Sequence, residues 1–181
     1  MARAWALVLA TALLLASCGG DEPSASEEYA NSVCSSLSAW VTDVQATIQS
    51  LQESGLSTSR EDIQSAFDQT KDATDALVND LEQAGAPETE DGQAAKEQLD
   101  ALATQLRQQL DLIQQALDSG QGLTAIAATV STAVSAAANA VNTTYENLKG
   151  LDPAGELQDA FENSEDCNTL GDQLADIGSQ S

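Results

Sequence analysis

The sequence predicts an all-α protein, an up-down-up-down antiparallel four-helix bundle with a short C-terminal helical extension. Three observations support this fold class. Apolar residues recur three and four positions apart over four long segments, the spacing of amphipathic helices. Loops of about two to six residues join these segments, so consecutive helices should lie antiparallel. The chain is rich in Ala, Leu, Gln and Asp but poor in aromatic residues, which leaves little material for strands.

The first two helices have continuous apolar stripes. Residues 26–55 are expected to form the first helix, which a capping box of Ser24 and Glu27 opens. A second capping box at residues 58–61 opens the second helix, which stops at the Gly-Ala-Pro sequence of residues 85–87. The residues expected to face inward are Tyr29, Val33, Leu37, Trp40, Val44, Ile48 and Leu51 in the first helix and Ile63, Phe67, Thr70, Thr74, Leu77, Leu81 and Ala84 in the second.

The third helix follows an acidic entry at residues 88–91, and the fourth ends at Gly150. A glycine-containing turn at residues 119–122 separates them. The expected inward residues are Ala95, Leu99, Leu102, Leu106, Leu110, Ile113 and Leu117 in the third helix and Leu123, Ala127, Val130, Val134, Ala137, Val141, Thr144 and Leu148 in the fourth.

The fourth helix lies in a run of 27 positions, from Ser119 to Tyr145, that carry no charge. One interpretation is a membrane-inserting segment. Most of these residues are Ala, Ser, Thr, Asn, Gly and Gln, which gain little from transfer into lipid. The favoured interpretation is therefore a central helix that the other helices surround.

A C-terminal extension follows the bundle. Asp152 and Pro153 suit the N-cap and first position of a short fifth helix over residues 154–163. Leu170, Leu174 and Ile177 indicate one or two further turns.

The composition excludes most catalytic chemistry. The chain has no histidine, so serine-histidine and cysteine-histidine nucleophiles are excluded. Residues 120–125 match a dinucleotide-binding fingerprint in spacing, but that motif needs a preceding strand, and here a helix precedes it. The acidic clusters at residues 88–91 and 162–166 lack the ligand spacing of a calcium loop. We expect no catalytic residue, no cofactor and no dedicated metal site.

The N-terminal segment predicts export. Arg3 precedes an apolar stretch from Trp5 to Leu15, which is too short for a stable membrane-spanning helix. The junction Leu15-Ala16-Ser17-Cys18 resembles the lipobox of bacterial lipoproteins. That resemblance implies cleavage before Cys18 and acylation of its thiol with fatty chains such as palmitate. An ordinary secretory signal with an incidental cysteine is the alternative.

These segments divide the chain into a signal peptide (1–17), a flexible tether (18–25) and a helical domain (26–181). Without residues 1–17 the chain has five basic and 29 acidic residues, a net charge of −24. Such a charge argues against nucleic acid and against contact with anionic lipid. Solubility is a better explanation of it than a cationic partner.

Cys34 and Cys167 are predicted to form a disulfide. Export places the domain where thiols are oxidised, and acylation of Cys18 leaves these two cysteines. An even number of antiparallel helices returns the chain to its starting end, where the C-terminal extension can bring Cys167 to Cys34. Two free buried thiols are the alternative.

The whole pattern resembles the small alanine-rich lipoproteins of high-GC Gram-positive bacteria. It predicts a protein at the extracytoplasmic face of the cell membrane, held by its lipid anchor and acting as a non-enzymatic scaffold with an envelope protein partner. The alternative is a module that binds an apolar or amphiphilic ligand between the helices, lined by Ala127, Ala137 and Val141. An apolar cavity above about 300 Å³ would favour the ligand module, and a filled core would favour the scaffold.

Overall fold

Helices make up nearly all of the described chain, which covers residues 23–54, 58–151 and 155–179 of the computed structural model. No strand occurs in these ranges, so the all-α prediction is confirmed. The helices are α1 (Ala25–Ser54), α2 (Arg60–Gln83), α3 (Glu90–Asp118), α4 (Leu123–Lys149), α5 (Glu156–Asn163) and α6 (Glu165–Ser179).

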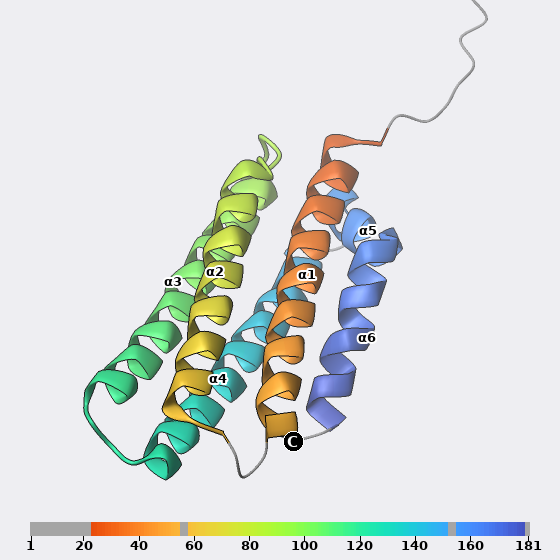
Figure 1. The fold of residues 1–181 in the computed structure, drawn as a ribbon. Coiled ribbons are helices and arrows are strands. Elements are labelled where there is room, and N and C mark those ends of the chain that lie inside the picture. Colours follow the sequence, from red (N-terminus) through yellow and green to blue (C-terminus); the bar gives the residue numbers. More distant parts are fainter. Residues whose placement is uncertain (1–22, 55–57, 152–154, 180–181) are drawn as a thin grey trace, which may run out of the picture.

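The helices pack as a bundle in which α1 lies between α2 and α6 (Figure 1). α3 packs against α2 on one side and most extensively against α4 on the other. α5 packs against α1 and α4 at the end of the bundle where α1 begins (Figure 1). The chain thus brings its last helix back alongside its first.

Two apolar clusters form the core. The larger takes buried residues from all six helices, among them Tyr29, Leu102, Val141, Phe161 and Leu170. The smaller lies among α2, α3 and α4 and consists of Ile63, Phe67, Leu110, Ile113, Leu117, Ile126 and Ala133. No fully buried residue of α1 belongs to this second cluster, so α2, α3 and α4 form the core there with only partial cover from Leu51.

The capping residues agree with the sequence at α1 and differ by one position at α2. Ser24 and Glu27 exchange the two hydrogen bonds of a capping box, as predicted. At α2 the box is formed by Ser59 and Asp62, not by residues 58 and 61. Thr58 instead donates its hydroxyl to the Leu51 carbonyl oxygen, because it still belongs to the connection from α1.

The C-terminal extension is longer than predicted. α5 begins at Glu156 with Gly155 as its N-cap, while Asp152 and Pro153 lie outside the described residues. α6 is a helix of 15 residues, more than the one or two turns expected. Leu170 and Leu174 of α6 are buried against the larger core cluster, and this burial stabilises the packing of α6.

Candidate functional site

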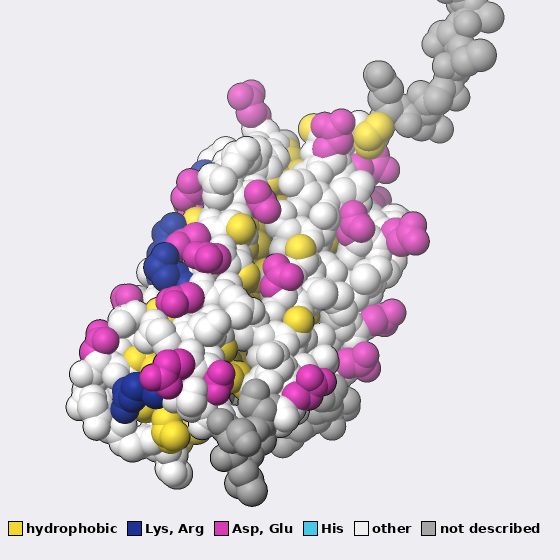
Figure 2. Space-filling view, viewed as in Figure 1, with side chains coloured by type: hydrophobic (Ala, Val, Ile, Leu, Met, Phe, Trp, Pro, Cys, Tyr) yellow, Lys and Arg dark blue, Asp and Glu magenta, His cyan; other side chains and the backbone are white. Residues whose placement is uncertain are grey.

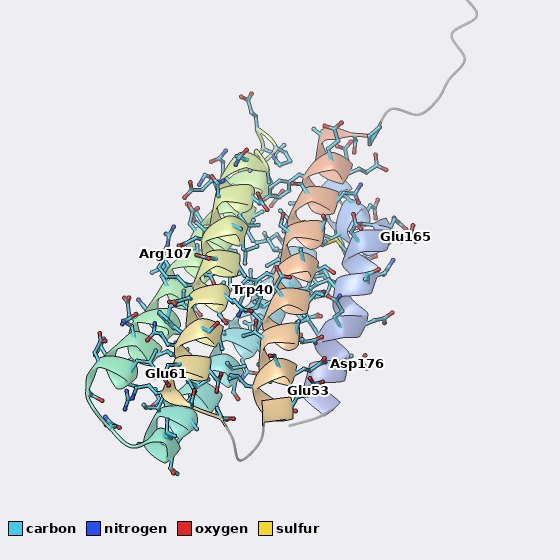
Figure 3. The ribbon with its side chains drawn as sticks, viewed as in Figure 1. Trp40, Glu53, Glu61, Arg107, Glu165 and Asp176 are labelled. Carbon is cyan, nitrogen blue, oxygen red and sulfur yellow. A yellow bond between two sulfur atoms is a disulfide. The ribbon has the colours of Figure 1, made fainter. Side chains whose placement is uncertain are left out.

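The predicted disulfide is present and joins α1 to α6. The Cα atoms of Cys34 and Cys167 are 4.8 Å apart, and both side chains are fully buried. The yellow sulfur bond is visible between these two helices (Figure 3). The bridge links residues 133 positions apart in sequence.

Polar contacts reinforce the position of α6. Gln173 accepts a hydrogen bond from Ser38 and donates one to Thr42, both on α1. The Tyr145 hydroxyl of α4 donates to the Cys167 carbonyl oxygen at 2.9 Å. Three helices therefore meet beside the disulfide.

The predicted ligand-lining residues do not come together around a cavity. Val141 and Ala137 are buried, but Ala127 is exposed, so its expected inward position is wrong. The inward stripe in the first half of α4 runs instead through Ile126 and Ala133, because Ala, Thr and Ser alternate there with little contrast in polarity. Leu123 is exposed as well, and Val130 and Val134 are only partly buried.

The apolar pocket between the helices is very small. It is lined by Trp40, Thr74, Leu106, Ala137 and neighbouring residues and has a volume of about 20 Å³. That is room for about one water molecule, far below the size of a ligand site. Figure 3 shows Trp40 pointing into the space between α1 and α2, where its indole nitrogen donates to the Thr74 hydroxyl at 3.0 Å.

The acidic surface offers no built cation site among the described residues. No group of three or more Cys, Asp or Glu side chains there has the geometry to hold a metal ion. Acidic side chains are spread over the face formed by α1, α2 and α6 (Figure 2). Glu61 and Glu165 project outward from that face (Figure 3).

The outer surface of α4 is the most distinctive feature of the protein. α4 is long and apolar enough to cross a membrane, yet only 22% of its most apolar window is buried. The expected central helix is therefore wrong: α4 packs mainly on α3 and leaves its other side open, because α1 and α2 pack chiefly on each other. Its exposed uncharged residues are Leu123, Thr124, Ala125, Ala127, Ala128, Ser131, Thr132, Ser135, Asn139, Asn142 and Thr143.

A row on α3 continues this uncharged surface. Its residues recur at helical spacing and are Gln98, Ala101, Gln105, Gln108, Leu112 and Gln115. Two open grooves of about 280 and 300 Å³ run between this row and α4. We call the row and the exposed α4 residues together the neutral face.

The neutral face contains apolar groups that a solvated surface does not need. Leu112 and Leu123 are 48% and 42% exposed. Thr129 beside the groove and Thr132 donate their hydroxyls to carbonyl oxygens of their own helix. These two hydroxyl hydrogens are thus already used, which lowers the cost of removing water from the face.

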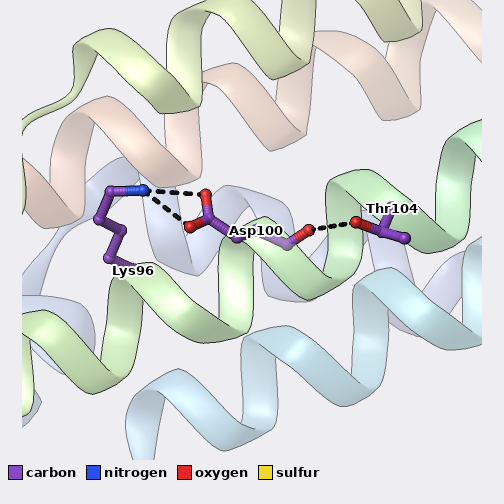
Figure 4. A network of polar contacts seen from close by, with 3 residues as sticks. All are labelled: Lys96, Asp100 and Thr104. Carbon is purple, nitrogen blue, oxygen red and sulfur yellow. Dashed lines mark hydrogen bonds and ion pairs between the residues drawn. The ribbon is translucent and has the colours of Figure 1, made fainter.

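The basic residues of α3 lie away from the neutral face. Lys96 pairs with Asp100 at 2.7 Å, and Thr104 donates to the Asp100 carbonyl oxygen one turn later (Figure 4). Arg107 projects from the outside of α3 on the same side as this ion pair (Figure 3). The Lys96–Asp100 pair and Arg107 thus lie on a different side of α3 from the neutral face, whereas Glu97 and Asp111 border it.

Sequence reasoning missed the α3 half of the neutral face. The signal was available, since Gln98, Ala101, Gln105, Gln108 and Leu112 recur three and four positions apart without a charge. The acylation site Cys18 lies outside the described residues. Comparison of the chain with family models, curated proteins and solved structures finds no match.

Proposed function

We propose that this protein is a lipid-anchored lipoprotein of the extracytoplasmic face of a bacterial cell membrane, and that it acts as a non-enzymatic scaffold through protein contacts. The filled core supports this proposal above all. An apolar pocket of about 20 Å³ cannot hold an acyl chain, whereas the neutral face is open to a macromolecule.

We also propose a topology for the helices. α1 to α4 form an up-down-up-down four-helix bundle, and α5 and α6 pack against α1 from outside. The alternating ends at which successive helices connect support this arrangement (Figure 1). It leaves the long α3–α4 side free for contact.

Anchoring rests on the residues before the domain. Leu15-Ala16-Ser17-Cys18 ends an apolar segment in the order of a lipobox, and two acyl chains on Cys18 give a stable anchor. The Cys34–Cys167 bridge supports an oxidising compartment outside the cytoplasm.

The test of the anchor is fractionation of bacteria that produce the full chain. The wild-type protein should remain with membranes and incorporate labelled palmitate. Cys18→Ala should abolish labelling and either release the protein or leave it uncleaved. The Cys34→Ala/Cys167→Ala variant should retain the label. A processed Cys18→Ala chain that stays on membranes would refute the anchor.

A second measurement separates scaffold from ligand module. Native mass spectrometry of protein extracted from membranes should show the acylated chain, as one copy or several, with no small molecule bound. A stoichiometric, non-covalent lipid would instead favour the ligand module and contradict the scaffold.

A further inference from the structure

We propose that the neutral face is a self-association surface, which packs against the same face of a second copy of this chain. The inference rests on the proposed scaffold function and names its first partner.

Charge decides which surface a second copy can use. A chain with a net charge of −23 repels a second copy of itself, and acidic side chains are spread over α1, α2 and α6 (Figure 2). From Leu123 to Thr143 on α4 the neutral face has no charged residue, and the carboxylates of Glu97 and Asp111 lie at its edge. Two copies that pair over this stretch bring only Glu146, at the end of the face, opposite its own copy. The acidic residues of α1 and α2 lie about one helix diameter, roughly 10 Å, behind the neutral face. This distance is about one Debye length at physiological salt, so their repulsion across the interface is largely screened.

The area matches a stable interface. The neutral stretch of α4, Leu123 to Thr143, is about 30 Å long, and two packed helices are about 20 Å wide. The face therefore offers about 600 Å² per copy, or about 1,200 Å² for two copies, the lower end of the range for specific interfaces.

The shape suits identical partners. A two-fold contact is self-complementary, so it needs one face that tolerates its own image. Small residues such as Ala128, Ser135 and Asn139 let helix backbones approach closely, and Leu112 can enter the groove beside α4 of the partner. Because both chains start at one end of the bundle, a two-fold axis parallel to α4 lets both anchors reach one membrane.

Cysteine cross-linking in membranes tests the proposal on the full chain. Ala128→Cys and Asn139→Cys, about 16 Å apart along one line of α4, should each link to themselves in a second copy. The matched control Ala46→Cys, exposed on α1, should give at least tenfold less of this product. A link to a different protein without self-linking would overturn the second-copy proposal.

Mass measurement of the detergent-extracted full chain gives an independent readout. The wild type should be a dimer, and dimer formation should strengthen with salt as the acidic faces are screened. Ala128→Glu should weaken association at least tenfold because it places like charges opposite each other, whereas Ala46→Glu should leave it unchanged. A monomer at every concentration, or an Ala128→Glu variant that associates as tightly as wild type, would overturn the proposal.

Reaction with a water-soluble maleimide tests the alternative that lipid, and not a second copy, covers the neutral face. Protection of Ala128→Cys without a self-link would place the face in lipid and overturn pairing. The mass measurement can also be made on the unacylated Cys18→Ala chain, so failure of self-association is distinguishable from failure of the anchor.

Discussion

Tyr145 on α4 donates its hydroxyl to the carbonyl oxygen of Cys167, in the first turn of α6. Its ring also lies over Gly171, where an added Cβ would sit 3.4 Å from the hydroxyl oxygen. The contact ties the end of the helix that bears the neutral face to the residue that forms the disulfide. The other tyrosine of the core, Tyr29, is 2% exposed, and its hydroxyl is without a hydrogen-bond partner in the described structure.

The two tyrosines should respond oppositely to removal of their hydroxyls. Tyr145→Phe should lower the free energy of unfolding by about 1 kcal/mol because it leaves the Cys167 carbonyl without its donor. Tyr29→Phe should leave it unchanged or raise it, because it removes a buried polar atom that gains no bond. Urea denaturation measures both, and equal losses would contradict the hydrogen-bond assignment.

Alkaline pH should destabilise the fold through Tyr29. Burial, with a smaller contribution from the nearby Asp100 carboxylate, raises the pKa of Tyr29 to about 12 from an ordinary value of 10.0. The unfolded chain therefore loses this proton first, so the stabilising contribution is complete below pH 10 and is lost as pH rises towards 12. In Tyr29→Phe the free energy of unfolding should fall less steeply between about pH 10 and 12. An unchanged slope would show that Tyr29 does not cause the loss.

Removal of the disulfide should cost much of the stability. The chain-entropy model gives about 5 kcal/mol for a loop of 133 residues, an upper figure for Cys34→Ala/Cys167→Ala. Denaturation of the variant beside reduced wild type provides the comparison, since both lack the bridge. A midpoint equal to that of oxidised wild type would show that the bridge adds nothing.

Gly92 should not tolerate alanine. It is buried in the first turn of α3, and a Cβ there would overlap the carbonyl oxygen of Pro87. Gly92→Ala should cost about 1–3 kcal/mol, the range for overpacking. Gly150→Ala is the matched control, because the nearest atoms to an added Cβ there are 3.7 Å away, an ordinary contact, and the change in stability should be less than about 0.5 kcal/mol. Similar thermal midpoints for the two variants would contradict this account.

Salt should raise the melting temperature. The chain has six basic residues for 29 acidic ones, so most carboxylates lack a cationic partner. Lys71–Asp75 and Lys96–Asp100 are exposed pairs within single helices. Salt screens the repulsion among the unpaired carboxylates, because the Debye length falls from about 10 Å at 0.1 M to about 3 Å at 1 M. Melting should occur at a higher temperature in about 0.5 M than in about 0.01 M sodium chloride, and a salt-independent midpoint would show that repulsion is negligible.

The sequence predicted helices best where large apolar residues mark the inward side. The α3 stripe from Ala95 to Leu117 is fully buried because leucines alternate there with charged and amide residues. In α4 the side chains are mostly small, so periodicity alone could not distinguish Ala127, which is exposed, from Ala133, which is buried. Which side of α4 is buried depends on where α1, α2 and α6 pack, and this tertiary packing cannot be derived from the periodicity of one helix.

One feature of the candidate site could be predicted from the sequence and another could not. The pairing of Cys34 with Cys167 was predictable because the expected return of the chain to its starting end places the two residues together. The volume of the core was not, because a pocket of about 20 Å³ depends on how Trp40 and Leu106 fill the space beside Ala137.

The bridge between the first and last helices also bears on how the protein survives proteases. A single cut at any peptide bond between Cys34 and Cys167 leaves both fragments in one covalent molecule. Only cleavage ahead of Cys34 separates the domain from the N-terminal segment. With the anchor proposed at Cys18, a copy nicked by a peptidase in an exposed loop would therefore stay attached, and shedding would require a cut within the short stretch before the bridge.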